Sequence, residues 1–210
     1  MPMQTNLPKR IFVTGTGTDV GKTVISSILV SGLAAKYWKP IQCGLEEPTD
    51  SQWIQKTSEL DRSHFIAETY RLPLPLSPHA AAAAENISIK LDDFLLPEIS
   101  YEEYLIIEGA GGIMVPINED QMILDLMVKL KIPVLLVSSN VLGTINHTLL
   151  SLEQLKRSGV DVLGVILNGD INTINRKAIE KYGDTTVLAE IPMIEQINST
   201  ILKELFLKHF

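Results

Sequence analysis

The chain has 210 residues, which suits one α/β domain with a buried sheet and leaves little room for a second independent domain. Its 45% hydrophobic and 20% charged residues exclude the composition of a disordered chain. A net charge of −7, without a cluster of Lys and Arg, opposes binding to nucleic acid or to an anionic membrane.

Taken from the N-terminus, residues 1–10 lack the apolar core of a signal peptide, and the apolar run at residues 132–142 is too short to span a bilayer. The single cysteine, Cys43, excludes an intrachain disulfide and suits a reducing compartment. A cytoplasmic location is therefore expected.

Apolar runs with β-branched residues alternate with amphipathic stretches along the chain, which is typical of βα units around a parallel sheet. In chain order, we expect strands at residues 10–14, 37–41, 104–107, 133–137, 162–167 and 186–189. The longest expected helices are at residues 22–35, 123–130, 144–157, 176–182 and 199–208. Ser77 and Pro78 have the residue types of an N-cap and a first helical position.

A glycine-rich loop follows the first expected strand. Residues 15–23 read GTGTDVGKT and precede a helix, which is the context of a P-loop. In such a loop, backbone N–H groups bind phosphate, Lys22 reaches the β- and γ-phosphates, and the Thr23 hydroxyl is available to Mg²⁺. Strict GxxxxGK[ST] spacing is not met, because Thr16 stands where the first glycine should be. The alternative is an ordinary glycine-rich turn, but the context favours a P-loop NTPase α/β fold over residues 1–210, with a mostly parallel sheet and helices on both faces.

Polar residues follow other expected strands, at the edge where open parallel sheets bind ligands. Lys39 and Asn168, taken alone, are more typical of a solvated charge and of a turn residue. Glu108 follows a buried run and is costly there unless a cation pairs with it, although a helix-capping role is the alternative. Asp50 is equally consistent with an N-cap. Thr23, Asp50 and Glu108 carry the hard oxygens that Mg²⁺ prefers.

Two glycine-containing segments are expected at the same edge. Residues 109–112 would let backbone N–H groups approach phosphate, or would form a tight turn after the strand. Residues 143–146 precede a helix, so their free N–H groups form a natural carboxylate site. His147 is expected to pack or cap rather than to catalyse.

Together these motifs resemble the dethiobiotin synthetase family. Its P-loop typically reads GT(D/G)T(D/E)VGKT and departs from Walker spacing in the same way. Stretches similar to its other blocks cover the chain nearly end to end in the same order: residues 39–44 (KPIQCG), 77–79 (SPH), 108–112 (EGAGG), 142–147 (LGTINH), Asn168 and 190–192 (EIP). The P-loop alone indicates an NTPase, whereas its combination with KPxxxG and EGAGG is specific.

The resemblance implies an ATP- and Mg²⁺-dependent ligase of biotin biosynthesis, which makes dethiobiotin, ADP and phosphate from 7,8-diaminononanoate, CO₂ and ATP. CO₂ adds to one amine as a carbamate, the carbamate oxygen attacks the γ-phosphate, and the second amine displaces phosphate and closes the ureido ring. Lys22 and Lys39 are the expected catalytic residues, because lysines neutralise the charge that develops during phosphoryl transfer. The expected metal ligands are Thr23, Asp50 and Glu108.

The resemblance also implies the binding residues. The expected ATP contacts are Asp19, Val20, Gly21, Lys22, Thr23, Val24, Asp50, Glu108, Gly109, Ala110, Gly111, Asn168, Gly169, Pro192, Met193 and Ile194. Among these, Asn168 is expected to read the adenine edge. The expected substrate contacts are Thr18, Cys43, Gly143, Thr144, Ile145 and Asn146, of which the last four act across a homodimer interface. Some members carry serine in place of Cys43, so either the backbone makes this contact or substrate affinity differs.

Two other functions fit part of the sequence. Ligases of the cobyrinate amidotransferase type share a related P-loop, but they carry an additional glutaminase domain. A P-loop ATPase acting as a switch or adaptor usually needs a lysine five positions before the P-loop lysine, where this chain has Gly17, or a guanine-reading NKxD motif, which the sequence lacks.

Overall fold

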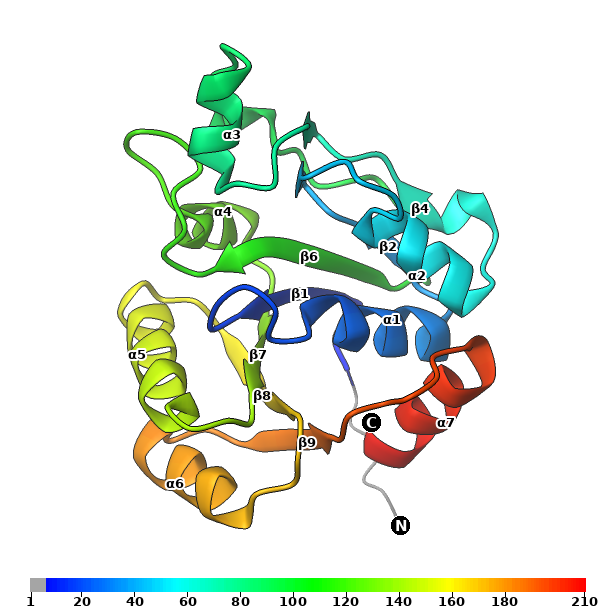
Figure 1. The fold of residues 1–210 in the computed structure, drawn as a ribbon, viewed down its shortest axis with the longest axis vertical. Coiled ribbons are helices and arrows are strands. Elements are labelled where there is room, and N and C mark those ends of the chain that lie inside the picture. Colours follow the sequence, from blue (N-terminus) through cyan, green and yellow to red (C-terminus); the bar gives the residue numbers. More distant parts are fainter. Residues whose placement is uncertain (1–6) are drawn as a thin grey trace.

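The computed structural model of the chain describes residues 7–210, and a mostly parallel sheet forms its centre (Figure 1). The sheet is seven-stranded, in the order β4-β2-β6-β1-β7-β8-β9, and each of its pairings is parallel. Its strands are β1 (Arg10–Gly15), β2 (Lys36–Trp38), β4 (Phe65–Ile66), β6 (Leu105–Gly112), β7 (Val134–Ser139), β8 (Val162–Asn168) and β9 (Val187–Ile191). A separate two-stranded parallel sheet pairs β3 (Ile41–Cys43) with β5 (Tyr70–Leu72).

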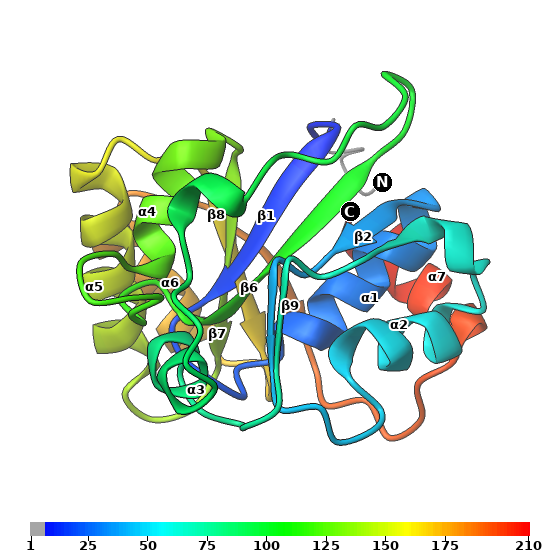
Figure 2. The same ribbon diagram turned by 90° about the horizontal axis from the view of Figure 1, so that it is seen from above.

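Helices cover both faces of the large sheet (Figure 2). One face carries α1 (Lys22–Leu33), α2 (Asp50–Ser58) and α7 (Ser199–His209), and the other carries α4 (Ile123–Leu130), α5 (Thr144–Arg157) and α6 (Thr173–Gly183). Helix α3 (Pro78–Ala84) lies against the small sheet, and two 3₁₀ turns span Arg62–His64 and Leu91–Asp93. In the described part of the chain, no helix is both long and apolar enough to cross a membrane.

The central strands are buried on both sides because alternate residues enter two different cores. In β1, Ile11 and Val13 pack on the side of α1, whereas Phe12 packs with Ile107 on the side of α4. All of these residues are fully buried. The strands therefore read as continuous apolar runs, and their carboxyl ends meet along one edge of the sheet.

The predicted α/β fold is confirmed, and the helices at 123–130 and 144–157 begin and end at the predicted residues. Ser77 and Pro78 are the N-cap and first residue of α3, as predicted. The helix predicted at 176–182 begins earlier, at Thr173, because the Asn172 side chain caps the N–H groups of Ile174 and Asn175. The helix predicted to reach residue 35 ends at Leu33, where the next residue is left-handed. The prediction of one domain includes residues 1–6, which lie outside the described residues.

Two strand predictions are wrong in ways that affect the site. The strand expected at 37–41 is divided into β2 and β3, which belong to different sheets, and Pro40 between them has no N–H to donate to a ladder. The strand expected to end at residue 107 continues to Gly112, because it keeps pairing with β1 through Gly15. Glu108 is therefore inside a buried strand, not at its tip, and residues 109–112 are strand rather than a turn.

Candidate active site

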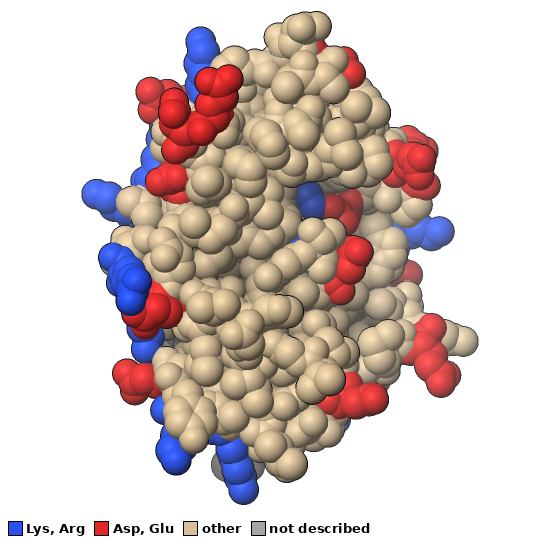
Figure 3. Space-filling model, turned by 60° about the vertical axis from the view of Figure 1, so that its left-hand side comes forward, with Lys and Arg blue, Asp and Glu red and all other residues tan. Residues whose placement is uncertain are grey.

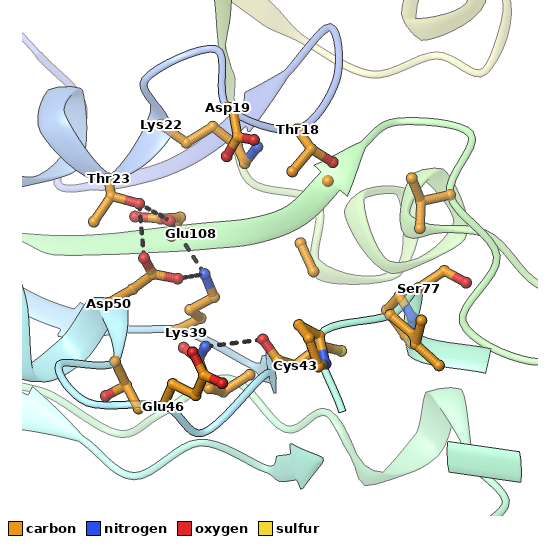
Figure 4. Close-up of a pocket in the computed structure, with 18 of the residues that line it drawn as sticks. Thr18, Asp19, Lys22, Thr23, Lys39, Cys43, Glu46, Asp50, Ser77 and Glu108 are labelled. Atoms are coloured by element: carbon orange, nitrogen blue, oxygen red, sulfur yellow. Dashed lines mark hydrogen bonds and ion pairs between the residues drawn. The ribbon is translucent and has the colours of Figure 1, made fainter. Parts of the chain in front are cut away.

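A cavity of about 800 Å³ opens at the carboxyl edge of the sheet (Figure 4). The P-loop forms one wall, β6 and the start of α2 form the floor, and the segments after β2 and before α3 form the other wall. Many of the predicted residues line it: Thr18, Asp19, Gly21, Lys22, Thr23, Val24, Lys39, Cys43, Asp50, Glu108, Ala110 and Gly111. The sequence therefore identified most of the polar side chains that the fold brings together here.

Four polar side chains meet on the cavity floor. Lys39 forms ion pairs with Asp50 and, at 3.3 Å, with Oε1 of Glu108. The Thr23 hydroxyl lies 2.9 Å from the same Glu108 oxygen and 3.0 Å from Asp50 Oδ1. Since a hydroxyl has one proton, Thr23 donates to one of these carboxylates at a time. Lys39 is 6% exposed and Glu108 is 1% exposed, so their charges face each other with little water between them.

Burial by itself would lower the pKa of Lys39, because it removes water from the ammonium. Glu108, and next Asp50, outweigh that effect, and the pKa of Lys39 is raised above its ordinary value. Lys39 is therefore a permanent cation at neutral pH. It can neutralise an anion in the cavity, but it cannot act as a base there.

Lys22 is the second cation and belongs to the P-loop. Its Nζ donates to the Gly17 carbonyl at 2.8 Å, so the side chain curls back over the loop. Burial lowers the pKa of Lys22; the charge of Glu108 opposes this effect and that of Lys39 adds to it. Since the two ammonium groups repel each other, an anion bound between them would relieve that repulsion.

The P-loop is held against β8 by a close contact. Gly21 is the N-cap of α1, with φ 98°, and a Cβ placed there would lie 2.1 Å from Nδ2 of Asn168. Asn168 Nδ2 also donates to the carbonyl of Val20 at 3.1 Å. Both observations place Asn168 directly beside the phosphate loop.

The predicted ATP contacts that follow β8 and β9, which are Gly169, Pro192, Met193 and Ile194, do not line the cavity. The Gly169 N–H donates to Ile191 O at 2.8 Å, which joins the ends of these strands. Pro192 and Ile194 continue from there, and Met193 is 75% exposed. Two more predicted ATP contacts, Val20 and Gly109, also lie outside the cavity lining. Val20 packs into the hydrophobic core between α1 and the sheet, and Gly109 packs against Phe12.

Residues 143–146 form the N-cap and the first turn of α5, and none of them lines the cavity of Lys39. Gly143 is the N-cap of α5, with φ 95°, and Thr144 is buried with its hydroxyl 2.8 Å from Ser138. A second hollow of about 520 Å³ lies beside it, lined by His147, Met114 and Leu150 together with part of the P-loop. Within one copy of the chain, residues 143–146 therefore lie outside the cavity that holds Lys22 and Lys39.

Cys43 lines the cavity and is half-buried. Burial raises the pKa of its thiol to about 11, and the nearby Lys39 charge only partly opposes this. The thiol therefore stays protonated at neutral pH and is a poor nucleophile. Its backbone carbonyl accepts a hydrogen bond from Nε2 of Gln42 at 3.2 Å.

Several lining residues were missed by sequence reasoning. Gln42 and Glu46 contribute side chains to the cavity, as do Ser77 and Pro78, which were predicted only as a helix start. Tyr37 lies below the floor and donates from its hydroxyl to Oε2 of Glu108 at 3.0 Å. One signal was available in the sequence. Tyr37 and Lys39 are two positions apart, and residues at this spacing on an extended strand point to the same face of the sheet.

The donor set on the floor fits Mg²⁺. Thr23, Asp50 and Glu108 present a hydroxyl and two carboxylates at mutual hydrogen-bond distance, and hard oxygens are what this cation prefers. The described residues contain no group of three or more His, Cys, Asp and Glu side chains suited to a metal. A cation here would need further oxygens from a bound nucleotide and water.

Comparisons with known proteins agree on one group. A family model described as an AAA domain matches residues 9–200. The chain is 47% identical to the ATP-dependent dethiobiotin synthetase BioD of Paramagnetospirillum magneticum, over 91% of this chain and 92% of that one. It is 45% identical to BioD of Lawsonia intracellularis (93% and 94% covered) and 43% identical to BioD of Christiangramia forsetii (94% of each).

Solved structures show the same fold at lower identity. A ParA family ATPase from Chlorobium tepidum superposes with a TM-score of 0.51 at 16% identity, covering 95% of this chain and 91% of that one. The septum site-determining protein MinD of Pyrococcus horikoshii, complexed with Mg-ADP, gives 0.50 at 15% identity, with 93% and 88% covered. These structures confirm the predicted P-loop NTPase fold.

Proposed function

Since this chain belongs to the family of ATP-dependent dethiobiotin synthetases, we propose that it closes the ureido ring of dethiobiotin in biotin biosynthesis. The substrates are 7,8-diaminononanoate, CO₂ and ATP, and the co-products are ADP and phosphate. The observation that best supports this reaction is the convergence of Lys39, Thr23, Asp50 and Glu108 beside the P-loop in one cavity.

The residues of the cavity suit each step. CO₂ and one amine of the substrate form a carbamate, whose negative charge is neutralised by Lys39. The carbamate oxygen attacks the γ-phosphorus of ATP and ADP leaves, while Lys22 and the N–H groups of the P-loop stabilise the charge on the transferring phosphoryl group. The second amine then attacks the carbonyl carbon of the mixed anhydride, phosphate leaves, and the ring closes.

Thr23, Asp50 and Glu108 would hold Mg²⁺, which supplies charge neutralisation to the phosphates when it is bound. Lys39 forms ion pairs with Asp50 and Glu108, so its ammonium and a bound cation would share the oxygens of these two carboxylates. Asn168, Gly169 and residues 192–194 would bind the adenine base, since Asn168 contacts the P-loop at Val20 and pairs with Ile191, which directly precedes residues 192–194.

Residues 143–146 would bind the substrate carboxylate in the cavity of a second copy, in a homodimer. Their separation from Lys39 within one chain supports this arrangement.

Charged side chains lie mainly at the margin of the molecular face drawn in Figure 3, apart from a hollow that holds basic and acidic atoms. Leu142 is fully exposed, and Met114 and Leu150 are more than half exposed.

Light scattering after size exclusion tests this assembly. Leu142→Asp should convert the dimer into an inactive monomer, because it places charge in an apolar interface. Leu207→Asp, on the outer face of α7, is the matched control, since Leu207 is 71% exposed and should tolerate the change. A wild-type chain that is a fully active monomer would contradict the dimer.

The reaction is tested by mass spectrometry of dethiobiotin formed from the diamine, bicarbonate, Mg²⁺ and ATP. ADP release should require the diamine and bicarbonate together. ATP hydrolysis that is slow and indifferent to both, with no cyclic urea formed, would exclude the proposed ligase and favour a nucleotide-driven switch. A cytoplasmic location remains a prediction from the lone cysteine.

A further inference from the structure

Tyr37 is the side chain that contacts the active-site carboxylate from below, on the side away from the cavity. It lies in β2, is fully buried, and its ring packs against Phe65 with 6.0 Å between ring centres. Its hydroxyl donates to Oε2 of Glu108 at 3.0 Å. The reaction has no step for a phenol, so this contact needs an explanation of its own.

The sheet places the two residues together. Strand β2 lies next to β6, and Tyr37 is opposite Ile106 in the parallel register. Glu108 is two residues further along β6 and so points to the same face of the sheet as Ile106. A long side chain on β2 can therefore reach the Glu108 carboxylate diagonally, and tyrosine has the required length and a donor at its tip.

The two oxygens of Glu108 have different partners. Oε1 faces the site and lies 2.9 Å from the Thr23 hydroxyl and 3.3 Å from Lys39. Oε2 is bound by Tyr37.

We propose that Tyr37 is a positioning residue for the reaction: by binding Oε2, it prevents Glu108 from rotating and keeps Oε1 directed at Thr23 and Lys39. A carboxylate free to rotate would present its oxygens in several orientations and would bind a cation and the Lys39 ammonium less well. Partners of this kind, behind a metal-binding carboxylate, typically change metal affinity or activity by about 10- to 100-fold.

Tyr37→Phe is the appropriate variant, because it removes the hydroxyl and keeps the ring that packs on Phe65. Tyr70→Phe is the matched control. Tyr70 also donates from its hydroxyl to a carboxylate, that of Asp93, and it lies outside the cavity. The melting temperature of each variant shows whether it is folded.

The first measurement does not depend on turnover. Mn²⁺ binding to the complex with the ATP analogue AMP-PNP is followed by electron paramagnetic resonance. Tyr37→Phe should weaken Mn²⁺ binding by about tenfold, while calorimetry in EDTA shows metal-free AMP-PNP binding within about twofold of wild type, because the P-loop is untouched. Tyr70→Phe should match wild type in both. A Tyr37→Phe protein that is only less heat-stable, with normal Mn²⁺ binding, would overturn the proposal.

The second measurement asks whether Tyr37 acts through Glu108. It rests on the proposed function, because it uses dethiobiotin formation as its assay. Tyr37→Phe should lower kcat by about tenfold or more in the wild-type background and by less than about twofold in a Glu108→Gln background, since coupled residues are not additive. Equal effects in both backgrounds would mean that Tyr37 does not act through Glu108. A wild-type protein that makes no dethiobiotin would refute the proposed function and leave the Mn²⁺ result to decide the role of Tyr37.

Discussion

Replacing Lys39 by methionine keeps the length of the side chain and removes the cation that contacts both Asp50 and Glu108. Glu108 would remain buried with the Thr23 and Tyr37 hydroxyls as its partners. We therefore expect the variant to lose folding stability and activity together.

The size of the stability loss follows from the ion pair. Two unit charges 3.3 Å apart attract each other by about 5 kcal/mol at an effective dielectric constant of about 20. The Asp50 side chain is 30% exposed, so water weakens its attraction to Lys39. The desolvation of Lys39 offsets part of the attraction to both carboxylates. Breaking a buried pair by removing one partner typically costs about 3–5 kcal/mol. We expect a loss near 3 kcal/mol in the free energy of unfolding, which lowers Tm by about 6–12 °C.

The pH dependence has a definite sign. The pKa of Lys39 is raised in the folded state, so its stabilising contribution is fully present below the ordinary lysine value of 10.5. The contribution is lost as the pH rises through the raised pKa. The difference in unfolding free energy between wild type and Lys39→Met should therefore be constant around neutral pH and narrow only above about pH 10.5.

Urea unfolding between pH 7 and 11 measures this difference, and the ligase assay measures turnover. We expect kcat to fall by about 10²- to 10³-fold, as for loss of one stabilising donor of a transition state, with ATP affinity mostly kept. The double variant Lys39→Met with Glu108→Gln should regain much of the stability, because it removes the unpaired charge. Wild-type stability of Lys39→Met, or strictly additive costs in the double variant, would refute the buried ion pair as the stabilising element.

Three further substitutions or modifications are informative. Lys22→Ala should abolish both ATP binding and turnover, since its ammonium lies within the P-loop at 2.8 Å from Gly17 O; unchanged ATP affinity in calorimetry would contradict this role. Gly21→Ala should lower the unfolding free energy by about 1–3 kcal/mol and weaken ATP binding, because its Cβ would displace Asn168; a variant that binds ATP normally would show that the loop adapts. The alkylation rate of Cys43 by iodoacetamide should rise about tenfold per pH unit from 7 to 10, since the thiol pKa is about 11; a plateau near pH 9 would indicate an unperturbed thiol.

Elements specified by local sequence were predictable. The strand, loop and helix around the P-loop are adjacent in sequence, and α4 and α5 begin and end where their apolar periodicity and flanking glycine or β-branched residues indicate. By contrast, β4 has two residues and β5 has three, and they are strands because they pair with β2 and β3, which are distant in sequence. Strands this short are too short to show a hydrophobic period in the sequence. The division of β2 from β3 had a local signal, Pro40, whose missing N–H interrupts a ladder.

The site was predictable to the extent that its residues belong to motifs. Lys39, Asp50 and Glu108 were expected, and they meet in one cavity. Tyr37 was not expected, because its role depends on β2 lying beside β6 rather than elsewhere in the sheet. Strand order is a property of the whole fold, and no spacing within residues 36–38 indicates which strand lies next to them.

The ion pair also gives a physical reason why the KPxxxG and EGAGG motifs are informative together. Burying a glutamate charge or a lysine charge without a partner is costly, and here Glu108 is 1% exposed and Lys39 is 6% exposed. Here the two lie on or directly after neighbouring strands, so each charge makes the burial of the other tolerable. A sequence that kept one motif without the other would leave an unpaired charge in the core. The pair is therefore required by the fold as well as by the proposed chemistry, and any variant of one residue has to be interpreted with its partner.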